Sequence, residues 1–267
     1  MFEELYAPLP DPARFLERIG LTDSASPDLE TLDRLILAHN LNVPFENLDV
    51  YDADIGVRLD VASLYDKIVV RRRGGYCFEL NALFMSLLES LGYDCYPVMV
   101  RVVWKATGYM PLSHRAGIVT IGGVRYFVDV GFGGPSPRTA IRLDDTEVQK
   151  SGPSDFVFDK APDGDFILCR LTEEGREQLL KFSDRYCENV DFLGPNEYHS
   201  RNENSGFKKT RVVNISRENS SAAITGNVLR IHKDEAVEET VLNTEDELRR
   251  ALREHFGIVV DFPLKIE

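Results

Sequence analysis

The chain has 267 residues, with 31 basic and 44 acidic side chains, a net charge of −13 and 43% hydrophobic residues. This charge argues against nucleic acid or an anionic membrane as a partner, and it disfavours a polyanionic ligand at long range. No apolar run is long enough to cross a membrane, and the start Met-Phe-Glu-Glu lacks the basic residues of a signal peptide. We therefore expect a cytoplasmic protein with a sizeable hydrophobic core.

The first ninety residues have the pattern of a helical bundle. Asp11 and Ser26 each precede a proline that can occupy the first position of a helix, so both are candidate caps. Asp60 can cap a further helix. We expect residues 1–92 to form a helical unit.

A helix is predicted to begin at Cys77. Apolar side chains follow at helical spacing until Gly92, a natural stop, and Gly74-Gly75 allows a tight entry. In the first turn, unpaired backbone N–H groups and the positive end of the helix dipole favour a thiolate over a thiol. Cys77 is thus a candidate nucleophile, although a lone cysteine is more often a small core residue.

A β-hairpin is predicted around Gly122-Gly123, because two β-rich runs flank this two-residue turn. Pairing Ile121 with Val124 fixes the register, which puts His114 and Asp129 on one face as diagonal neighbours. A solvated pair is the alternative, but Asp129 lies in an apolar strand and a buried carboxylate needs a partner. The hairpin therefore predicts a histidine oriented by an acid.

The remainder of the chain alternates strands and turns. The segment 93–195 contains short β-rich runs typical of an antiparallel barrel or sandwich, at 96–103, 116–121, 124–130, 155–158 and 165–171. The segment 196–267 is predicted to be an α/β lid, with a polar loop at 196–206, strands at 207–216, 221–225 and 228–232, and a helix opened by the capping box Thr244 to Glu247. The fold class is α+β.

Cys77, His114 and Asp129 have the residue types of a Cys-His-Asp triad, the arrangement of cysteine proteases. Three stretches around them resemble the arylamine N-acetyltransferases: Asn-Val-Pro-Phe-Glu-Asn-Leu-Asp (42–49), Arg-Gly-Gly-Tyr-Cys-Phe-Glu-Leu-Asn (73–81) and Val-Asp-Val-Gly-Phe-Gly (128–133). The resemblance implies ping-pong transfer of acetyl from acetyl-CoA, through a Cys77 thioester, to an arylamine, hydrazine or N-hydroxyarylamine. It also suggests that Arg73 pairs with Glu46 to brace the catalytic helix.

The loop after the hairpin could offer backbone N–H groups to a pyrophosphate, although a tight structural loop is an equal alternative; its residues are Gly131, Phe132, Gly133 and Gly134. The resemblance implies that this loop binds CoA, together with Tyr198 and Asn204. Phe132, Val98 and Tyr76 are candidates for the apolar wall of the acceptor site, and each could equally be ordinary core.

Two features qualify the resemblance. Arg115 follows His114 where many relatives continue with apolar residues, so the donor and acceptor pockets can differ. The four cysteines, Cys77, Cys95, Cys169 and Cys187, form no Cys-x-x-Cys pair, which predicts neither a zinc site nor a disulfide framework. The alternatives are an amide synthase or cysteine hydrolase that uses the same triad without acetyl-CoA, or a binding protein that only retains the fold.

Overall fold

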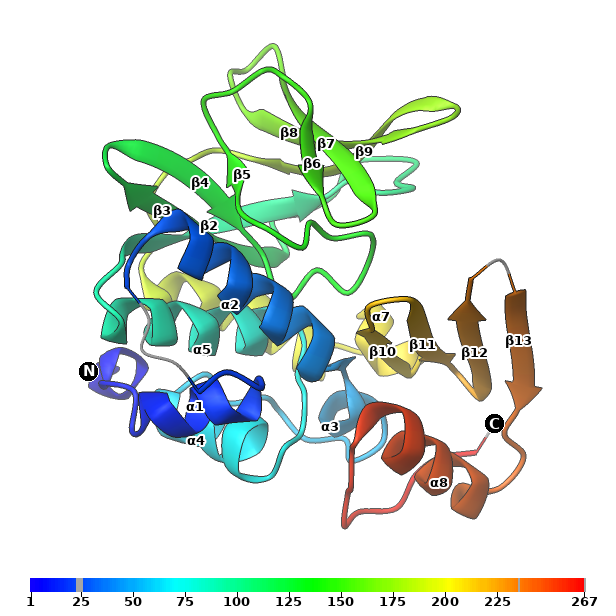
Figure 1. Cartoon of the computed structure of the whole chain (residues 1–267). Helices are drawn as coiled ribbons and strands as arrows, with labels where there is room; N and C mark the ends of the chain where they lie inside the picture. Colours follow the sequence, from blue (N-terminus) through cyan, green and yellow to red (C-terminus); the bar gives the residue numbers. More distant parts are fainter. Residues whose placement is uncertain (23–25, 235, 267) are drawn as a thin grey trace.

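The computed structural model describes residues 1–22, 26–234 and 236–266. Its N-terminal part is helical (Figure 1). The helices of this part share one apolar core. The elements are η1 (Glu3–Tyr6), α1 (Pro12–Arg18), α2 (Leu29–Asn42), α3 (Leu48–Tyr51), α4 (Val61–Tyr65), the π-helical turn η2 (Asp66–Val70) and α5 (Cys77–Ser90).

Three of the four predicted helix caps are confirmed, among them the capping box of Thr244 and Glu247. The side chains of Asp11 and Asp60 each accept a hydrogen bond from the backbone N–H three residues later. The prediction for Ser26 is wrong, because α2 begins after Asp28, whose carboxylate accepts from Thr31 N at 2.8 Å. A carboxylate gains from the helix dipole as well as from the hydrogen bond, so it caps better than a hydroxyl two residues earlier.

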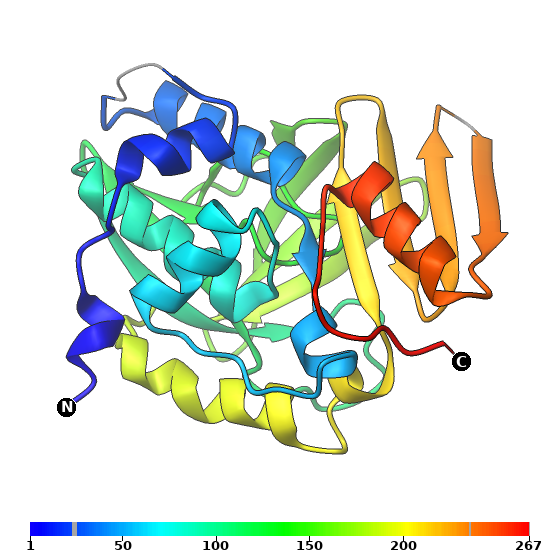
Figure 2. The same cartoon turned by 90° about the horizontal axis from the view of Figure 1, so that it is seen from below.

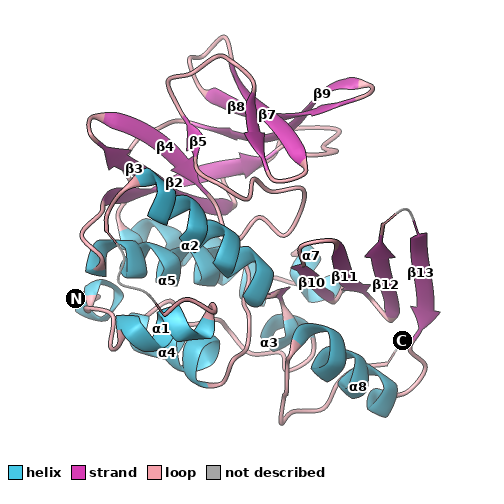
Figure 3. Cartoon of the chain, in the orientation of Figure 1, coloured by secondary structure: helices cyan, strands magenta, loops and turns pink. Residues whose placement is uncertain are grey.

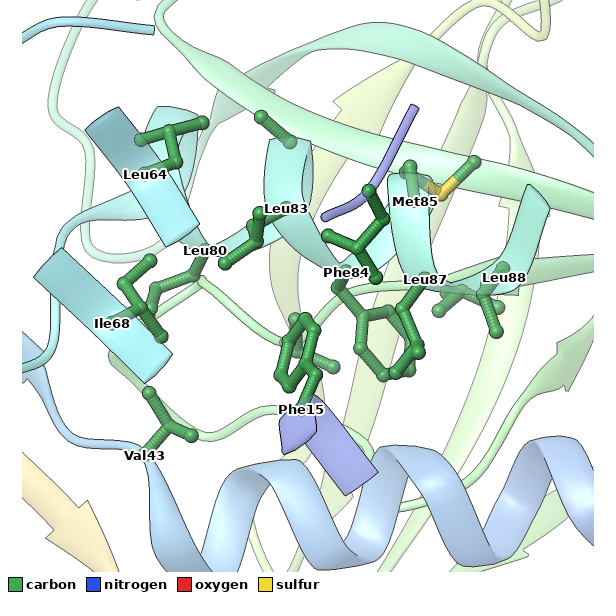
Figure 4. Packing of buried hydrophobic residues seen from close by; sticks show 14 of the residues in the cluster. Phe15, Val43, Leu64, Ile68, Leu80, Leu83, Phe84, Met85, Leu87 and Leu88 are labelled. Atoms are coloured by element: carbon green, nitrogen blue, oxygen red, sulfur yellow. The ribbon is translucent and has the colours of Figure 1, made fainter. Parts of the chain in front are cut away.

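Helix α5 is the centre of the helical core. It begins at Cys77, and Gly92 follows its cap with a φ of +88°, as the sequence predicts. One flank of α5 meets α1 and α4, and the other covers β2 and β3. Figure 4 shows this packing, in which α5 contributes Leu80, Leu83, Phe84, Met85, Leu87 and Leu88, and the neighbouring elements contribute Phe15, Val43, Leu64 and Ile68.

The middle of the chain forms an eight-stranded antiparallel sheet in the order β5-β4-β3-β2-β9-β8-β7-β6. Its edge strands approach each other, because Arg142 N donates to Gln149 Oε1 at 2.7 Å and Gln149 Nε2 donates back to Arg142 O at 2.9 Å. The predicted barrel-like sheet is thus confirmed as a nearly closed barrel. Its strands are β2 (Asp94–Val102), β3 (His114–Ile121), β4 (Val124–Val128), β5 (Ile141–Arg142), β6 (Gln149–Ser151), β7 (Ser154–Lys160), β8 (Phe166–Thr172) and β9 (Gly175–Phe182).

Strand β9 was not expected from the sequence. A β-bulge at its pairing with β8, between Leu168 and Cys169, leaves Leu179 and Leu180 of β9 both buried. Two consecutive inward side chains break the period-two pattern by which a strand is predicted.

A second, five-stranded sheet has the order β1-β10-β11-β12-β13, and helix α8 (Glu245–Phe256) lies along one of its faces (Figure 2). Strand β1 comes from the N-terminal helical part, so the sheet joins segments far apart in the chain. Helices α1, α2, α4 and α5 lie below the large sheet and beside the small one (Figure 3). The strands are β1 (Phe45–Glu46), β10 (Val212–Ser216), β11 (Ser220–Thr225), β12 (Val228–Lys233) and β13 (Ala236–Val241).

The predicted loop at 196–206 is wrong, because most of it belongs to α6 (Leu193–Arg201), which follows the turn η3 (Asn189–Phe192). Helix α6 buries only Asn196 and Ser200, so it has no apolar stripe to reveal it. The strand predicted from residue 207 begins at Val212 instead, because the turn α7 (Gly206–Lys209) precedes it. Within the described residues, no helix has the length and apolar content to cross a bilayer.

Candidate active site

The hairpin register brings His114 and Asp129 together. Ile121 pairs with Val124 and Gly117 with Val128, as the two-residue turn predicts. Asp129 follows the end of β4, and its Oδ2 lies 2.6 Å from Nε2 of His114. Both side chains are at most 2% exposed, so this contact is shielded from water.

The second carboxylate oxygen of Asp129 is held by Asn81, which sequence reasoning missed. Asn81 Nδ2 donates to Asp129 Oδ1 at 2.8 Å and to the backbone oxygen of Arg115 at 2.6 Å, while its Oδ1 accepts from Val130 N at 2.9 Å. One side chain of α5 therefore contacts both hairpin strands. The sequence did contain one indication of this role, because Asn81 lies four residues after Cys77 and therefore on the same face of the predicted helix.

Cys77 is the first residue of α5 and is 4% exposed. The loop after β4 passes directly over it at Gly131. A Cβ at Gly131 would lie 2.9 Å from Cys77 Cα, closer than ordinary contacts allow. The glycine thus lets the end of the hairpin meet the start of the helix.

The site strongly favours the charged form of His114. Burial lowers the pKa of its imidazole, but the negative charges of Asp129 and of the Cys77 sulfur, with hydrogen bonds to both groups, raise it to about 10. Since Nε2 contacts Asp129, Nδ1 is the nitrogen that remains for Cys77. The geometry supports an imidazolium between a carboxylate and a sulfur.

Buried charges hold the start of α5. Arg73 Nε donates to Glu46 Oε1 at 2.9 Å, which confirms the predicted pairing, and Lys67 Nζ lies 2.7 Å from Glu79 Oε1 and 2.8 Å from Asp49 Oδ2. Glu79 Oε2 also accepts from the backbone N–H that precedes Cys77, at 3.0 Å. Burial raises the pKa of Glu79 to about 7, because the like charges of Asp49 and Glu46 offset part of the attraction to Lys67.

The glycine loop borders a cavity of about 50 Å³. Phe132 separates this cavity from the buried pair, since its ring centroid lies 5.9 Å from that of His114. A Cβ at Gly133 would lie 2.8 Å from the ring of Phe45. Glycine at this position therefore lets the backbone lie close to that ring. The cavity is lined by Phe132, Gly133, Gly134, Arg138, Asn214 and Ser216, among others, so a cation and polar groups face it.

Gly131, which lies over Cys77, and four other predicted binding residues do not line this cavity. Val98 is fully buried in the barrel core. Tyr76 is also fully buried, and its hydroxyl donates to Asn196 Oδ1. Tyr198, on α6, is 45% exposed, and Asn204 lies in the turn that follows α6. The described residues contain no group of three or more metal-ligating side chains.

Comparisons with known proteins identify the family of this chain. An N-acetyltransferase family model matches residues 28–265. The arylamine N-acetyltransferase of Mycolicibacterium smegmatis is 32% identical over 249 residues, which cover 91% of this chain and 90% of the relative. The chain belongs to the arylamine N-acetyltransferase family. The resemblance seen in the sequence is therefore confirmed.

Two further relatives are described with their acceptor substrates or with CoA. The Salmonella typhimurium protein named arylamine N-acetyltransferase / N-hydroxyarylamine O-acetyltransferase is 29% identical over 262 residues, covering 92% of this chain and 88% of the relative. The structure of the Mycobacterium marinum arylamine N-acetyltransferase in complex with CoA matches with a TM-score of 0.86 at 30% identity, over 93% of each chain. The overall fold is thus that of this family.

The raised pKa of His114 predicts a pH-dependent contribution to stability. This contribution is fully present below about pH 6.5 and is lost as the pH rises through about 10. The difference in unfolding free energy between the wild type and His114→Gln should therefore be largest below pH 6.5 and shrink toward pH 10. Urea titrations across this range measure it, with exposed His232→Gln as the matched control. A difference that stays constant would contradict the assigned ion pair.

The buried charges predict a large effect of Lys67→Met. Its loss leaves Glu79 and Asp49 buried without their cation, which should cost about 3–5 kcal/mol of unfolding free energy. The control Arg230→Met breaks the exposed pair with Glu239 and should cost about 0–1 kcal/mol. Denaturant unfolding of both variants compares them, and equal losses would show that the network does not hold α5.

Proposed function

We propose that this chain transfers an acetyl group from acetyl-CoA to an arylamine, hydrazine or N-hydroxyarylamine, with Cys77, His114 and Asp129 as its catalytic residues. The observation that carries the proposal is the buried 2.6 Å contact between His114 and Asp129, beside a cysteine at the start of a helix. The activities for which the relatives are named support the substrate classes. The four free cysteines fit a cytoplasmic location.

In the first half-reaction, the Cys77 sulfur attacks the acetyl carbonyl of the thioester as a thiolate. A bond forms between this sulfur and the carbonyl carbon, and the bond from that carbon to the CoA sulfur breaks. His114 gives its proton to the departing CoA thiolate and becomes neutral. Backbone N–H groups in the first turn of α5 would hold the developing oxyanion.

In the second half-reaction, the acceptor nitrogen or oxygen attacks the acetyl group on Cys77. Neutral His114 takes the acceptor's proton, Cys77 leaves as a thiolate and the ion pair is restored. Asp129 keeps its charge throughout and fixes the ring orientation of His114. We assign the donor and acceptor to the side of Phe132 that faces the cavity, where Gly133, Gly134 and Arg138 are available to phosphate groups. Tyr198 and Asn204 on the outer surface remain candidate CoA contacts.

The proposal predicts that acetyl-CoA labels Cys77 alone. Burial raises the pKa of Cys95 and Cys169 to about 12 and also raises the pKa of Cys187, so these thiols stay protonated. Intact mass after incubation with acetyl-CoA should show one added acetyl group, and peptide mapping should place it on Cys77. Adding an arylamine should remove it.

This experiment also separates the alternatives. An amide synthase or hydrolase that uses the triad without acetyl-CoA would show no acetyl adduct. Cys77→Ser should lose the adduct, because a hydroxyl is a far poorer nucleophile than a thiolate. Acetyl groups on another cysteine, with Cys77 unmodified, would refute the assignment.

Asp129→Asn tests the role of the acid. The amide oxygen can still accept from Asn81 Nδ2 and Gly131 N, but the amide nitrogen would donate to His114 Nε2. This fixes the wrong tautomer, which should lower the acetylation rate by roughly 10³–10⁴-fold with a soluble fold. Asp144→Asn, at an exposed pair with Arg125, is the matched control. Near-normal acetylation of Cys77 in Asp129→Asn would make the carboxylate merely structural.

A further inference from the structure

Arg115 points away from the catalytic pair. Strand alternation puts its side chain on the face of β3 opposite to His114, toward the helical core. The side chain is 3% exposed, and its guanidinium lies 4.4 Å from the centroid of the Phe192 ring. Its Nη2 donates to Asn189 Oδ1 at 2.6 Å.

The charge of Arg115 is not compensated. Its Nε is buried with no hydrogen-bond partner, and no carboxylate of the described residues forms an ion pair with it. Burial lowers its pKa to about 10, since the more distant negative charges, Glu89 first among them, offset only part of the cost. A buried guanidinium without an anion is unfavourable by several kcal/mol. The unpaired Nε–H therefore points to a missing acceptor.

A cavity of about 160 Å³ adjoins this side chain. One wall is a face of α5 formed by Ala82, Met85, Ser86 and Glu89, and another is β2 at Cys95 and Pro97. Because Cys77 lies at the start of α5 and these residues lie one to three turns later, the cavity is separate from the cavity bordered by Phe132.

We propose that this cavity binds a small monocarboxylate, of about the size of acetate, on the Arg115 guanidinium. A carboxylate supplies a charged acceptor for Nε, and two oxygens match the planar array of guanidinium donors. The apolar wall at Ala82 and Met85 suits a short aliphatic tail. Glu89 at the rim opposes a second negative charge, so a dianion is disfavoured.

This position connects the cavity to the catalytic pair. The backbone oxygen of Arg115 accepts from Asn81 Nδ2, and the same nitrogen donates to Asp129 Oδ1. An anion that fixes Arg115 therefore also restrains the strand on which His114 lies.

Trifluoroacetate is the probe, observed by ¹⁹F NMR in the full chain and displaced by acetate. We expect saturable binding that Arg115→Met weakens about tenfold or more, since one charge-assisted interaction is lost. Arg250→Met, an exposed site on α8, removes the same charge and should leave binding unchanged. Arg138→Met should also leave it unchanged, which separates this cavity from the one bordered by Phe132.

A second variant separates loss of the binding cavity from loss of folding. Ser86→Leu keeps Arg115 and fills the cavity, so it should abolish trifluoroacetate binding while thermal unfolding in anion-free buffer stays cooperative. Acetate should raise the Tm of the wild type and not that of Ser86→Leu. Equal binding by the wild type and Arg115→Met, absence of binding, or displacement by chloride as readily as by acetate would overturn the proposal.

Discussion

The candidate site depends on one constraint, the contact that Asn81 makes between helix α5 and the β3–β4 hairpin. Its amide binds the backbone of both strands and the carboxylate of Asp129. Because Asn81 lies one helical turn after Cys77, these bonds fix the sulfur relative to His114. Gly131 allows the approach from the hairpin, since any side chain there would collide with Cys77. The arrangement of Cys77, His114 and Asp129 is therefore a property of the junction between the helical core and the barrel, which neither part could provide alone.

The sequence predicted the parts of the site that depend on local rules. The Gly122-Gly123 turn fixes the hairpin register, and the register alone places His114 diagonal to Asp129. The start of α5 at Cys77 and its end near Gly92 follow from apolar spacing and a glycine stop. The barrel-like sheet follows from the short β-rich runs. Each of these patterns involves residues that are close together in the sequence. They can therefore be recognised without knowledge of the tertiary structure.

The missed features depend on contacts between distant segments. Helix α6 has no apolar stripe, and the bulge beside Leu168 hides the alternation of β9. Asn81 can hold Asp129 only when the hairpin lies over helix α5. The residues around Asn81 do not indicate that this contact forms. Likewise, the sequence marks Arg115 only as an extra charge beside His114, and its burial beside a cavity of about 160 Å³ is visible only in the folded chain.

The central claim is that His114, held by Asp129, keeps Cys77 as one half of an ion pair before substrate binds. The most direct measurement is the rate at which iodoacetamide alkylates Cys77, followed by peptide mapping from about pH 5 to 9. The account predicts that alkylation persists at about pH 6 in the wild type and that His114→Ala removes most of it, because the cation is lost while the helix start is kept. A wild-type rate that follows an ordinary thiol, which titrates near pH ~8.5, would contradict the preformed ion pair.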